Sequence, residues 1–371
     1  MQPSDMNRNS KYRILIFLPL TLLLWLTSCD EDGSTNELDF DRKFMLTSLA
    51  DGLIIPNFES LQTSVDNLSD ATDDFIANPN EQELLLLREA WVLAVLDYQH
   101  CSAFGFGPAN LPLGPFSTVL AVFPVDESQI ALNIENPDFN LIASFDRDVR
   151  GFYTVEYLIY GKEQTAEEIV LGFDQHRKDY LALIVLELKS IVDQIVTEWK
   201  GSYRSEFIDN EGTSAGSSIS LLFNAFVKDY ENIKNFKVEL PAGLTAGQSN
   251  ADPTLVEAYY SGISAELLQV HFTNIINIWS GKTREGQDLV SFEEYLSVVV
   301  GGDELVTQTR AAILDIERAI SSLPAGELSA NIEDDAVKNL RDVLQANTAN
   351  FKSSMSSLLG ISITYSSGDG D

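Results

Sequence analysis

Apolar side chains recur every three or four residues along most of the chain from about residue 40 onward, which is the period of an amphipathic α-helix. The clearest stripe begins after Thr165 and contains Ile169, Phe173, His176, Tyr180, Ile184, Leu188, Ile191, Ile195 and Trp199. We predict one continuous helix there, roughly 50 Å long at 1.5 Å per residue, with its end near Gly201.

Further helices are predicted from the same periodicity over residues 40–78, 81–103, 145–160, 214–235, 253–280, 291–299, 303–322 and 332–358. Pro56 should kink or break the first of these. Helix starts carry capping patterns, namely Asn80 with Glu83, Thr165 with Glu168, Ser291 with Glu294, and Asp252 before Pro253.

No segment alternates polar and apolar residues strongly enough to predict a sheet, so the expected fold class is all-α. We predict two helical bundles packed against each other, over residues 39–205 and 206–362, with a frayed tail at 363–371. Residues 104–144 contain eight Gly and Pro residues together with Phe104, Phe106, Phe116 and Phe123, which predicts a long irregular but packed loop in the first bundle.

The first 28 residues have the pattern of a signal peptide. Three basic residues precede an apolar run over residues 14–27, which is shorter than the roughly 20 residues that span a bilayer. The run ends Leu26-Thr27-Ser28-Cys29, which resembles a bacterial lipobox and implies cleavage before Cys29 and lipidation of its thiol. Residues 29–38 then form a polar tether. The alternative is an ordinary signal peptide with an accidental cysteine.

Composition narrows the possible partners. The chain has 56 acidic and 24 basic side chains and a net charge of −32, which excludes nucleic acid as a direct partner and favours cations or basic proteins. The alternative is that the acid excess only maintains solubility. Three histidines and two cysteines exclude a zinc finger and a disulfide scaffold, and Cys101 is predicted to be a buried core thiol.

Familiar catalytic motifs are absent from the sequence: it has no G-x-S-x-G, no H-E-x-x-H, no phosphate loop and no dinucleotide-binding fingerprint. His176 lies on an apolar stripe and is predicted to be packed or hydrogen-bonded in the core. Neither it nor His100 or His271 is expected to be catalytic.

The most informative stretch is Gly151-Phe152-Tyr153-Thr154-Val155-Glu156. It resembles the G-x-H-x-x-E signature of the imelysin-like family, which includes the M75 peptidases and iron-uptake lipoproteins, with Tyr153 in the place of the histidine. Weaker matches to the family occur elsewhere along the chain, in the order that the family shows. They are Ala90-Trp91, residues 104–108, residues 123–126 with Ile130, Lys237 with residues 240–243, and Glu257 with Ser261 and Ser264.

The resemblance implies an all-α fold of two bundles, with a functional site around the Tyr153–Glu156 helix near their interface. Residues i and i+3 share a helix face, so these two side chains can converge on one metal ion or one proton. The candidate site residues are Glu156, Tyr153 and Arg150, with Asp126, Glu257 and Ser261 carried over more weakly. Carboxylates and phenols favour iron(III) or calcium. Alternatively, Tyr153 donates a hydrogen bond to the carboxylate, or Tyr153 only packs while Glu156 pairs with Arg147 or Arg150.

We therefore expect a lipid-anchored protein of the cell envelope, on the outer membrane with a periplasmic or surface face. The expected function is non-enzymatic binding of a metal or small ligand, with iron-uptake proteins of the envelope as partners. The first alternative is an M75-type metallopeptidase that uses Glu156, and it is weakened by the loss of the histidine that a metallopeptidase most needs. The second alternative is a scaffold for another envelope protein.

Overall fold

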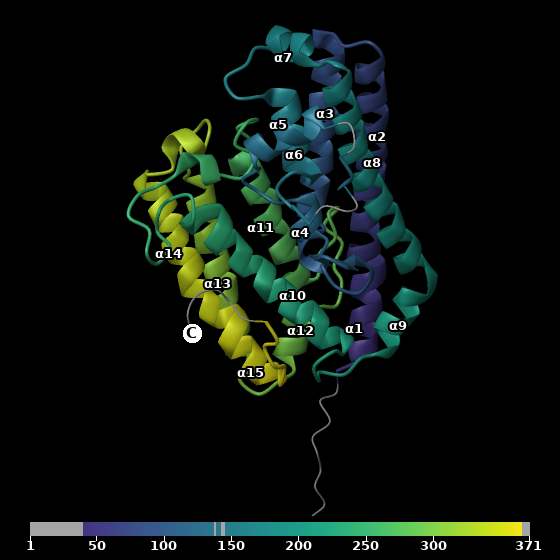
Figure 1. Cartoon of the computed structure of the whole chain (residues 1–371). Coiled ribbons are helices and arrows are strands. Elements are labelled where there is room, and N and C mark those ends of the chain that lie inside the picture. Colours follow the sequence, from purple (N-terminus) through teal and green to yellow (C-terminus); the bar gives the residue numbers. More distant parts are fainter. Residues whose placement is uncertain (1–39, 137–138, 142–144, 366–371) are drawn as a thin grey trace, which may run out of the picture. The chain divides into compact units, whose positions relative to one another are not determined.

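The computed structural model describes residues 40–136, 139–141 and 145–365, and it confirms the all-α fold (Figure 1). Residues Asp39–Asp371 form one compact unit. The predicted division of this unit into two bundles stays a prediction. The predicted signal peptide, Cys29, the tether and residues 366–371 of the predicted tail lie outside the described residues. No helix in the described ranges is long and apolar enough to cross a membrane.

The α-helices up to residue 209 are α1 (Arg42–Leu49), α2 (Ile55–Ala77), α3 (Glu81–Gln99), α4 (Ser117–Leu120), α5 (Glu127–Glu135), α6 (Gly151–Tyr160), α7 (Ala166–Gly172), α8 (Gln175–Glu198) and α9 (Arg204–Asp209). Those that follow are α10 (Ser218–Asn232), α11 (Ser264–Ser280), α12 (Phe292–Ser297), α13 (Gly302–Ser321), α14 (Asp335–Ala349) and α15 (Met355–Leu359). Two short antiparallel strands, β1 (Asn110–Leu111) and β2 (Gly114–Pro115), form a small hairpin.

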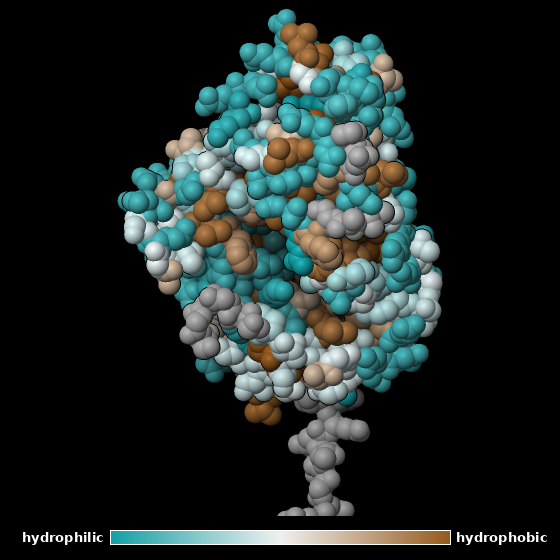
Figure 2. All heavy atoms as spheres, viewed as in Figure 1, coloured by the Kyte–Doolittle hydropathy of each residue, from teal (hydrophilic) through white to brown (hydrophobic). Residues whose placement is uncertain are grey.

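Helix packing forms two neighbouring groups. In the first, α2 packs on α3 and α8, and α6 contacts α3 and α8 (Figure 1). In the second, α13 packs on α14, and α11 contacts α10 and α12. The groups meet where α3 packs on α11 and where α10 packs on η2, a 3-10 turn over Ser102–Phe104. Buried aromatic and aliphatic side chains form one continuous cluster through both groups, and hydrophilic residues cover most of the face shown in Figure 2.

Four π-helical turns interrupt or extend these helices: η1 (Ala50–Ile54), η5 (Trp199–Tyr203), η6 (Ile233–Glu239) and η9 (Asn350–Ser354). The turn η1 lies directly before Pro56, so the predicted break takes the form of a π turn that leads into α2. Gly201 has non-helical dihedral angles inside η5, close to the predicted end of α8.

The prediction of one continuous helix over residues 165–199 is wrong, because this stretch forms two helices. The Thr165–Glu168 capping box is present, but α7 ends at Gly172. Asp174 then accepts a hydrogen bond from the Arg177 amide and starts α8 as a new N-cap. This break leaves His176 exposed, which corrects its predicted place in the core. Cys101 is buried, as predicted, and burial raises the pKa of its thiol.

Four other predicted starts also shift, and one of them is that of the helix expected from 214, which begins at Ser218 as α10. Residues before Gly151 form turns, so the helix expected from 145 begins at α6. Asp252 caps only a 3-10 turn, η7 (Pro253–Leu255), and the helix expected from 253 begins at Ser264. Asp334 caps α14, which begins three residues later than expected. Asn80 caps α3 by accepting from the Gln82 and Glu83 amides, and the Ser291–Glu294 capping box is confirmed.

Candidate functional site

Helix α6 carries Tyr153 and Glu156, and its position is fixed at its first turn. Gly151 has a φ of +79°, and a Cβ atom there would lie 2.3 Å from the Leu120 carbonyl oxygen, so only glycine fits. The indole nitrogen of Trp91, on α3, donates a 2.8 Å hydrogen bond to the Phe152 carbonyl. These contacts hold the first turn of α6 against α4 and α3, and Tyr153 and Glu156 contact the segment that follows η7.

Tyr153 donates its phenol proton to Oε1 of Glu257. The other oxygen of Glu257 lies 2.7 Å from the ammonium of Lys237, which is on η6. Gln99, the last residue of α3, bridges the pair: its amide nitrogen is 3.2 Å from Glu257 Oε1 and its oxygen accepts from Lys237 at 2.8 Å. Only 3% of the Glu257 side chain and 7% of the Lys237 side chain are exposed. These four residues, which we call the Tyr153 cluster, form a closed ion-pair network.

Glu156 lies one turn further along α6 and contacts the same segment. Its Oε1 accepts a 2.7 Å hydrogen bond from the backbone N–H of Ser261. The turn that presents this N–H contains Ala258 with a φ of +51°, a left-handed conformation that is uncommon for a residue with a side chain. The strained turn therefore positions a backbone donor at a carboxylate that is only 1% exposed.

A second buried pair lies on α10 and α11. The carboxylate of Asp229 is 2.7 Å from Nε2 of His271 and accepts a 2.7 Å hydrogen bond from the Ser102 hydroxyl. Burial lowers the pKa of His271, although Asp229 acts in the opposite direction. The imidazole and the carboxylate share this one hydrogen bond inside the core. Burial alone raises the pKa of Asp229, but His271, Ser102 and Lys237 outweigh it and the net shift is downward.

Burial dominates the acid–base behaviour of the remaining groups. It raises the pKa of Tyr153 well above its ordinary value, and the Glu257 carboxylate raises it further, so the phenol stays protonated as a donor. Burial raises the pKa of Glu156 to about 7, against the opposing hydrogen bonds from Ser261 and Tyr260. Burial also lowers the pKa of Lys237, and Glu257 counteracts that effect.

The structure brings together four of the six predicted site residues. Tyr153, Glu156, Glu257 and Ser261 lie on α6 and the segment after η7. Tyr153 donates to Glu257, whereas the sequence suggested Glu156 as the acceptor.

Arg150 and Asp126 have other roles. The Arg150 guanidinium is 2.8 Å from Glu187 on α8 and donates to the carbonyls of Leu141 and Asp146. Asp126 is the N-cap of α5 and accepts from the Gln129 amide. Arg147, the other predicted partner of Glu156, donates to the Leu113 carbonyl.

Sequence reasoning noted Lys237 only as a family landmark and did not single out Gln99, Asp229 or their contacts. A weak signal was present on α10, where Asp229 interrupts a buried face formed by Phe226, Tyr230 and, at the start of η6, Ile233. A lone acid on such a face needs a buried partner. Which partner it has could not be read from the sequence, because His271 is 42 positions away.

The donor set of the Tyr153 cluster does not fit a metal ion. The Lys237 ammonium lies beside the Glu257 carboxylate, on the position that a bound cation would need. To bind a metal ion as a phenolate, Tyr153 would have to lose its proton, and burial and the Glu257 carboxylate both raise the pKa of that phenol. Among the residues that the structure describes, no group of three His, Cys, Asp or Glu side chains is placed to hold a metal.

Comparison with known proteins places these residues in a wider context. The imelysin (peptidase M75) family matches residues 54–355, which is more than half of the chain. No curated protein matches the sequence. One solved structure with the same fold, from Parabacteroides distasonis ATCC 8503, is provisionally named an iron-regulated protein A precursor; it is 18% identical, with a TM-score of 0.72 over 85% of this chain and 95% of that one. An imelysin-like protein from Psychrobacter arcticum 273-4 is also 18% identical, with a TM-score of 0.69 over 88% of this chain and 99% of that one.

Proposed function

This chain belongs to the imelysin family, and on that premise we propose that it is a non-enzymatic, small-ligand-binding lipoprotein of the cell envelope that works with iron-uptake proteins. One observation carries the non-enzymatic part of the proposal. The Lys237 ammonium, 2.7 Å from Glu257, neutralises the carboxylate that a metal ion or a reacting proton would otherwise need. The Glu257 carboxylate is therefore already paired within the protein.

The alternative of a metallopeptidase with Glu156 as its catalytic carboxylate has less support. Glu156 is 1% exposed, so a peptide could reach it only if the segment over residues 256–263 moved. Its carboxylate already accepts the Ser261 N–H, and the residue one turn before it is a tyrosine that donates to Glu257. General-base catalysis needs a carboxylate within hydrogen-bond reach of the attacking water.

Proteolysis and metal binding test this part of the proposal together. We expect the purified wild type to hydrolyse no casein and to show no rise in melting temperature with Fe(III), Ca²⁺ or Zn²⁺. Tyr153→His alone should not create a metal site, because Lys237 remains, whereas Tyr153→His with Lys237→Met should gain a metal-dependent rise. Casein hydrolysis that disappears in Glu156→Gln would establish the peptidase alternative. A metal-dependent rise in the wild type that disappears in Tyr153→Phe would show that the cluster binds metal.

The iron and envelope parts have separate support. The name of the Parabacteroides distasonis protein refers to iron regulation, and the two folds are similar. The Leu26-Thr27-Ser28-Cys29 sequence supports a lipid anchor. We expect transcription of the gene to rise when the host is starved of iron, and labelled palmitate to be incorporated in the wild type but not in Cys29→Ser. Unchanged transcription would contradict the iron part, and labelling of Cys29→Ser would contradict the anchor.

A further inference from the structure

The outward side of α3 is apolar, although a helix at a protein surface ordinarily presents polar residues to water. At about 100° per residue, five apolar side chains fall within an arc of about 120° on this side. They are Leu85, Leu86, Val92, Leu93 and Leu96, which we call the α3 apolar face. Leu85, Leu86 and Leu93 are 48%, 43% and 57% exposed, whereas Trp91, on the opposite side of the helix, is fully buried. Helix α3 is therefore apolar on both sides, and the described part of the chain covers only one of them.

Helix α13 shows the ordinary arrangement. It has 20 residues against 19 in α3, and its exposed side carries Asp303, Thr307 and Arg310. The single large apolar side chain exposed on α13 is that of Leu314, at 51%. Single exposed leucines on a soluble protein need no explanation, whereas contiguous exposed apolar patches usually mark interaction sites. The α3 apolar face is of the second kind.

The helical hairpin that contains this face is strongly acidic. Residues 55–99 comprise α2, the connecting turn and α3, and they contain nine acidic residues and one basic residue. The basic residue, Arg88, is directed to α6, where it donates to the Ile159 carbonyl at 2.9 Å. Three of the acids pair with a lysine or an arginine, namely Glu59 with Lys200, Asp66 with Lys189, and Asp97 with Arg284.

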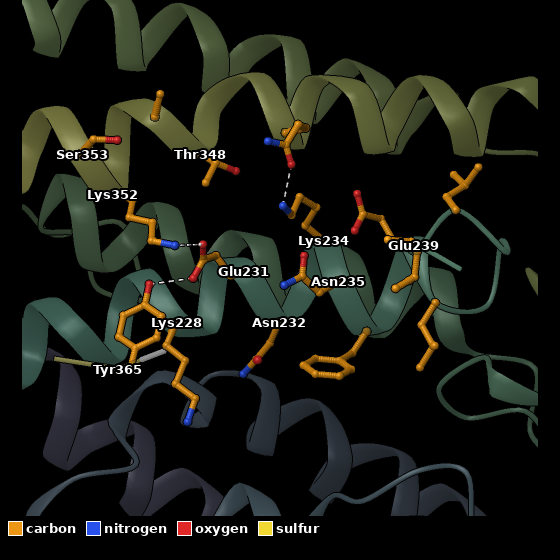
Figure 3. Close-up of a pocket in the computed structure, with 17 residues that line it drawn as sticks. Lys228, Glu231, Asn232, Lys234, Asn235, Glu239, Thr348, Lys352, Ser353 and Tyr365 are labelled. Carbon is orange, nitrogen blue, oxygen red and sulfur yellow. Dashed lines mark hydrogen bonds and ion pairs between the residues drawn. The ribbon is translucent and has the colours of Figure 1, made fainter. Parts of the chain in front are cut away.

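The other six acids of the hairpin have no ion-pair partner within residues 40–136, 139–141 and 145–365. They are Asp70, Asp73, Asp74, Glu81, Glu83 and Glu89. The pocket between η6 and η9 shows the opposite case: Lys352 lies 2.9 Å from Glu231, whose other oxygen accepts a 2.7 Å hydrogen bond from Tyr365 (Figure 3). Glu89 is exposed and lies within the arc of the α3 apolar face, so this surface combines leucines with unpaired negative charge.

We propose that the α3 apolar face binds an amphipathic helix of another protein, with branched aliphatic side chains on one side and lysine or arginine along its edges. The stretch from Leu85 to Leu96 is about 17 Å long, which is about three helical turns. A partner helix that runs along α3 can place apolar residues at positions i, i+3 or i+4, and i+7 against this stretch. Its basic residues then meet Glu81 and Glu89.

A basic helix complements this surface better than the other possible occupants do. Two copies of this chain joined through the same face would bring two sets of unpaired acids together, since such a contact places a surface against itself. The anionic leaflet of a bilayer would be repelled in the same way. The proposal does not depend on the proposed function, because the five side chains of the α3 apolar face take no part in the candidate site.

Fluorescence anisotropy with the full chain tests the proposal. The probe is a fluorescein-labelled peptide of leucine and lysine, about 18 residues and about 27 Å long as a helix, with its leucines on one side. Two control peptides have the same length: one has glutamate in place of lysine, and the other has the same composition with its leucines distributed around the helix. We expect the probe to bind at physiological ionic strength and each control peptide to bind at least about tenfold more weakly, because one lacks the charge and the other the apolar side.

Leucine variants show where the probe binds. Leu86→Ser and Leu93→Ser should each weaken binding roughly fivefold to tenfold, which is the effect of burying the exposed half of a leucine side chain. Leu314→Ser is the matched control, because it changes a similarly exposed leucine on α13 and should leave the affinity unchanged. Glu89→Gln should weaken binding severalfold, and this difference should shrink as salt is added. All four side chains are exposed, so each variant should fold, which circular dichroism verifies.

Three results would overturn the proposal. In the first, the probe does not bind, or a control peptide binds as tightly as the probe does. In the second, Leu86→Ser and Leu93→Ser bind the probe as Leu314→Ser does. In the third, the face has another occupant: sedimentation velocity shows a dimer of this chain, or the chain binds vesicles of phosphatidylethanolamine and phosphatidylglycerol, and Leu86→Ser with Leu93→Ser abolishes that association.

Discussion

Replacing Lys237 by methionine removes the ammonium of the Tyr153 cluster and retains most of the aliphatic side chain. Glu257 would then be a buried carboxylate with only Tyr153 and Gln99 as donors. At 2.7 Å and an effective dielectric constant of 20, the lost Coulomb attraction is about 6 kcal/mol. Part of it is offset because the lysine no longer has to be desolvated, and removing one partner of a buried pair typically costs about 3–5 kcal/mol. We therefore expect the free energy of unfolding to fall by about that amount.

Urea unfolding followed by circular dichroism at pH 7 measures this loss. Lys338→Met is the matched control, because the Lys338–Asp335 pair is on the surface and its removal should leave the unfolding midpoint unchanged. Adding Glu257→Gln to Lys237→Met should recover much of the lost stability, since no unpaired charge then remains buried. If Lys237→Met shifts the midpoint no further than Lys338→Met does, or if the second substitution recovers nothing, the cluster is not a balanced ion-pair network.

Three other predictions concern α6 and α8. The pKa of Glu156 is about 7 in the folded chain and ordinarily 4.5, so its carboxyl ionises first in the unfolded state, and the wild type loses stability as the pH rises from about 4.5 to 7. Glu156→Gln has no such loss, so its free energy of unfolding in urea, relative to that of the wild type, should be about 3 kcal/mol higher at pH 8 than at pH 4.5. The same difference between variant and wild type at both pH values would contradict this. Tyr153→Phe removes one donor to the Glu257 carboxylate and should cost about 1.5–3 kcal/mol in the same assay, whereas a neutral effect would mean that the hydrogen bond contributes nothing. Asp174→Ala removes the N-cap of α8 and should cost about 1 kcal/mol, with Asp174→Asn as a control that retains the cap and most of the stability.

Much of the fold could be predicted because helical periodicity and capping are local properties. The Asn80, Thr165 and Ser291 caps each depend on residues at most three positions away, and all three form as expected. The failures occurred where a stripe of constant period continued across a break. Phe173 is buried after α7 has ended, so the apolar spacing showed no interruption at Gly172.

The site was only partly predictable because its contacts connect distant segments. The i, i+3 spacing correctly placed Tyr153 and Glu156 on one face of α6. Their partners, however, are more than 100 positions away, and the turn that presents Ser261 depends on a strained backbone at Ala258. A single sequence contains no signal for such a turn, because alanine ordinarily favours the helix that was predicted there.

The Tyr153 cluster also constrains how this protein can diverge. Tyr153, Lys237 and Glu257 belong to three separate segments, yet each depends on the others for its charge or hydrogen bond. A change at one position leaves a buried group without compensation, so lineages that replace it should replace a second one soon afterwards. Among homologues aligned to this chain, substitutions at these three positions should occur jointly on the same branches, whereas those at Lys338 should be scattered independently.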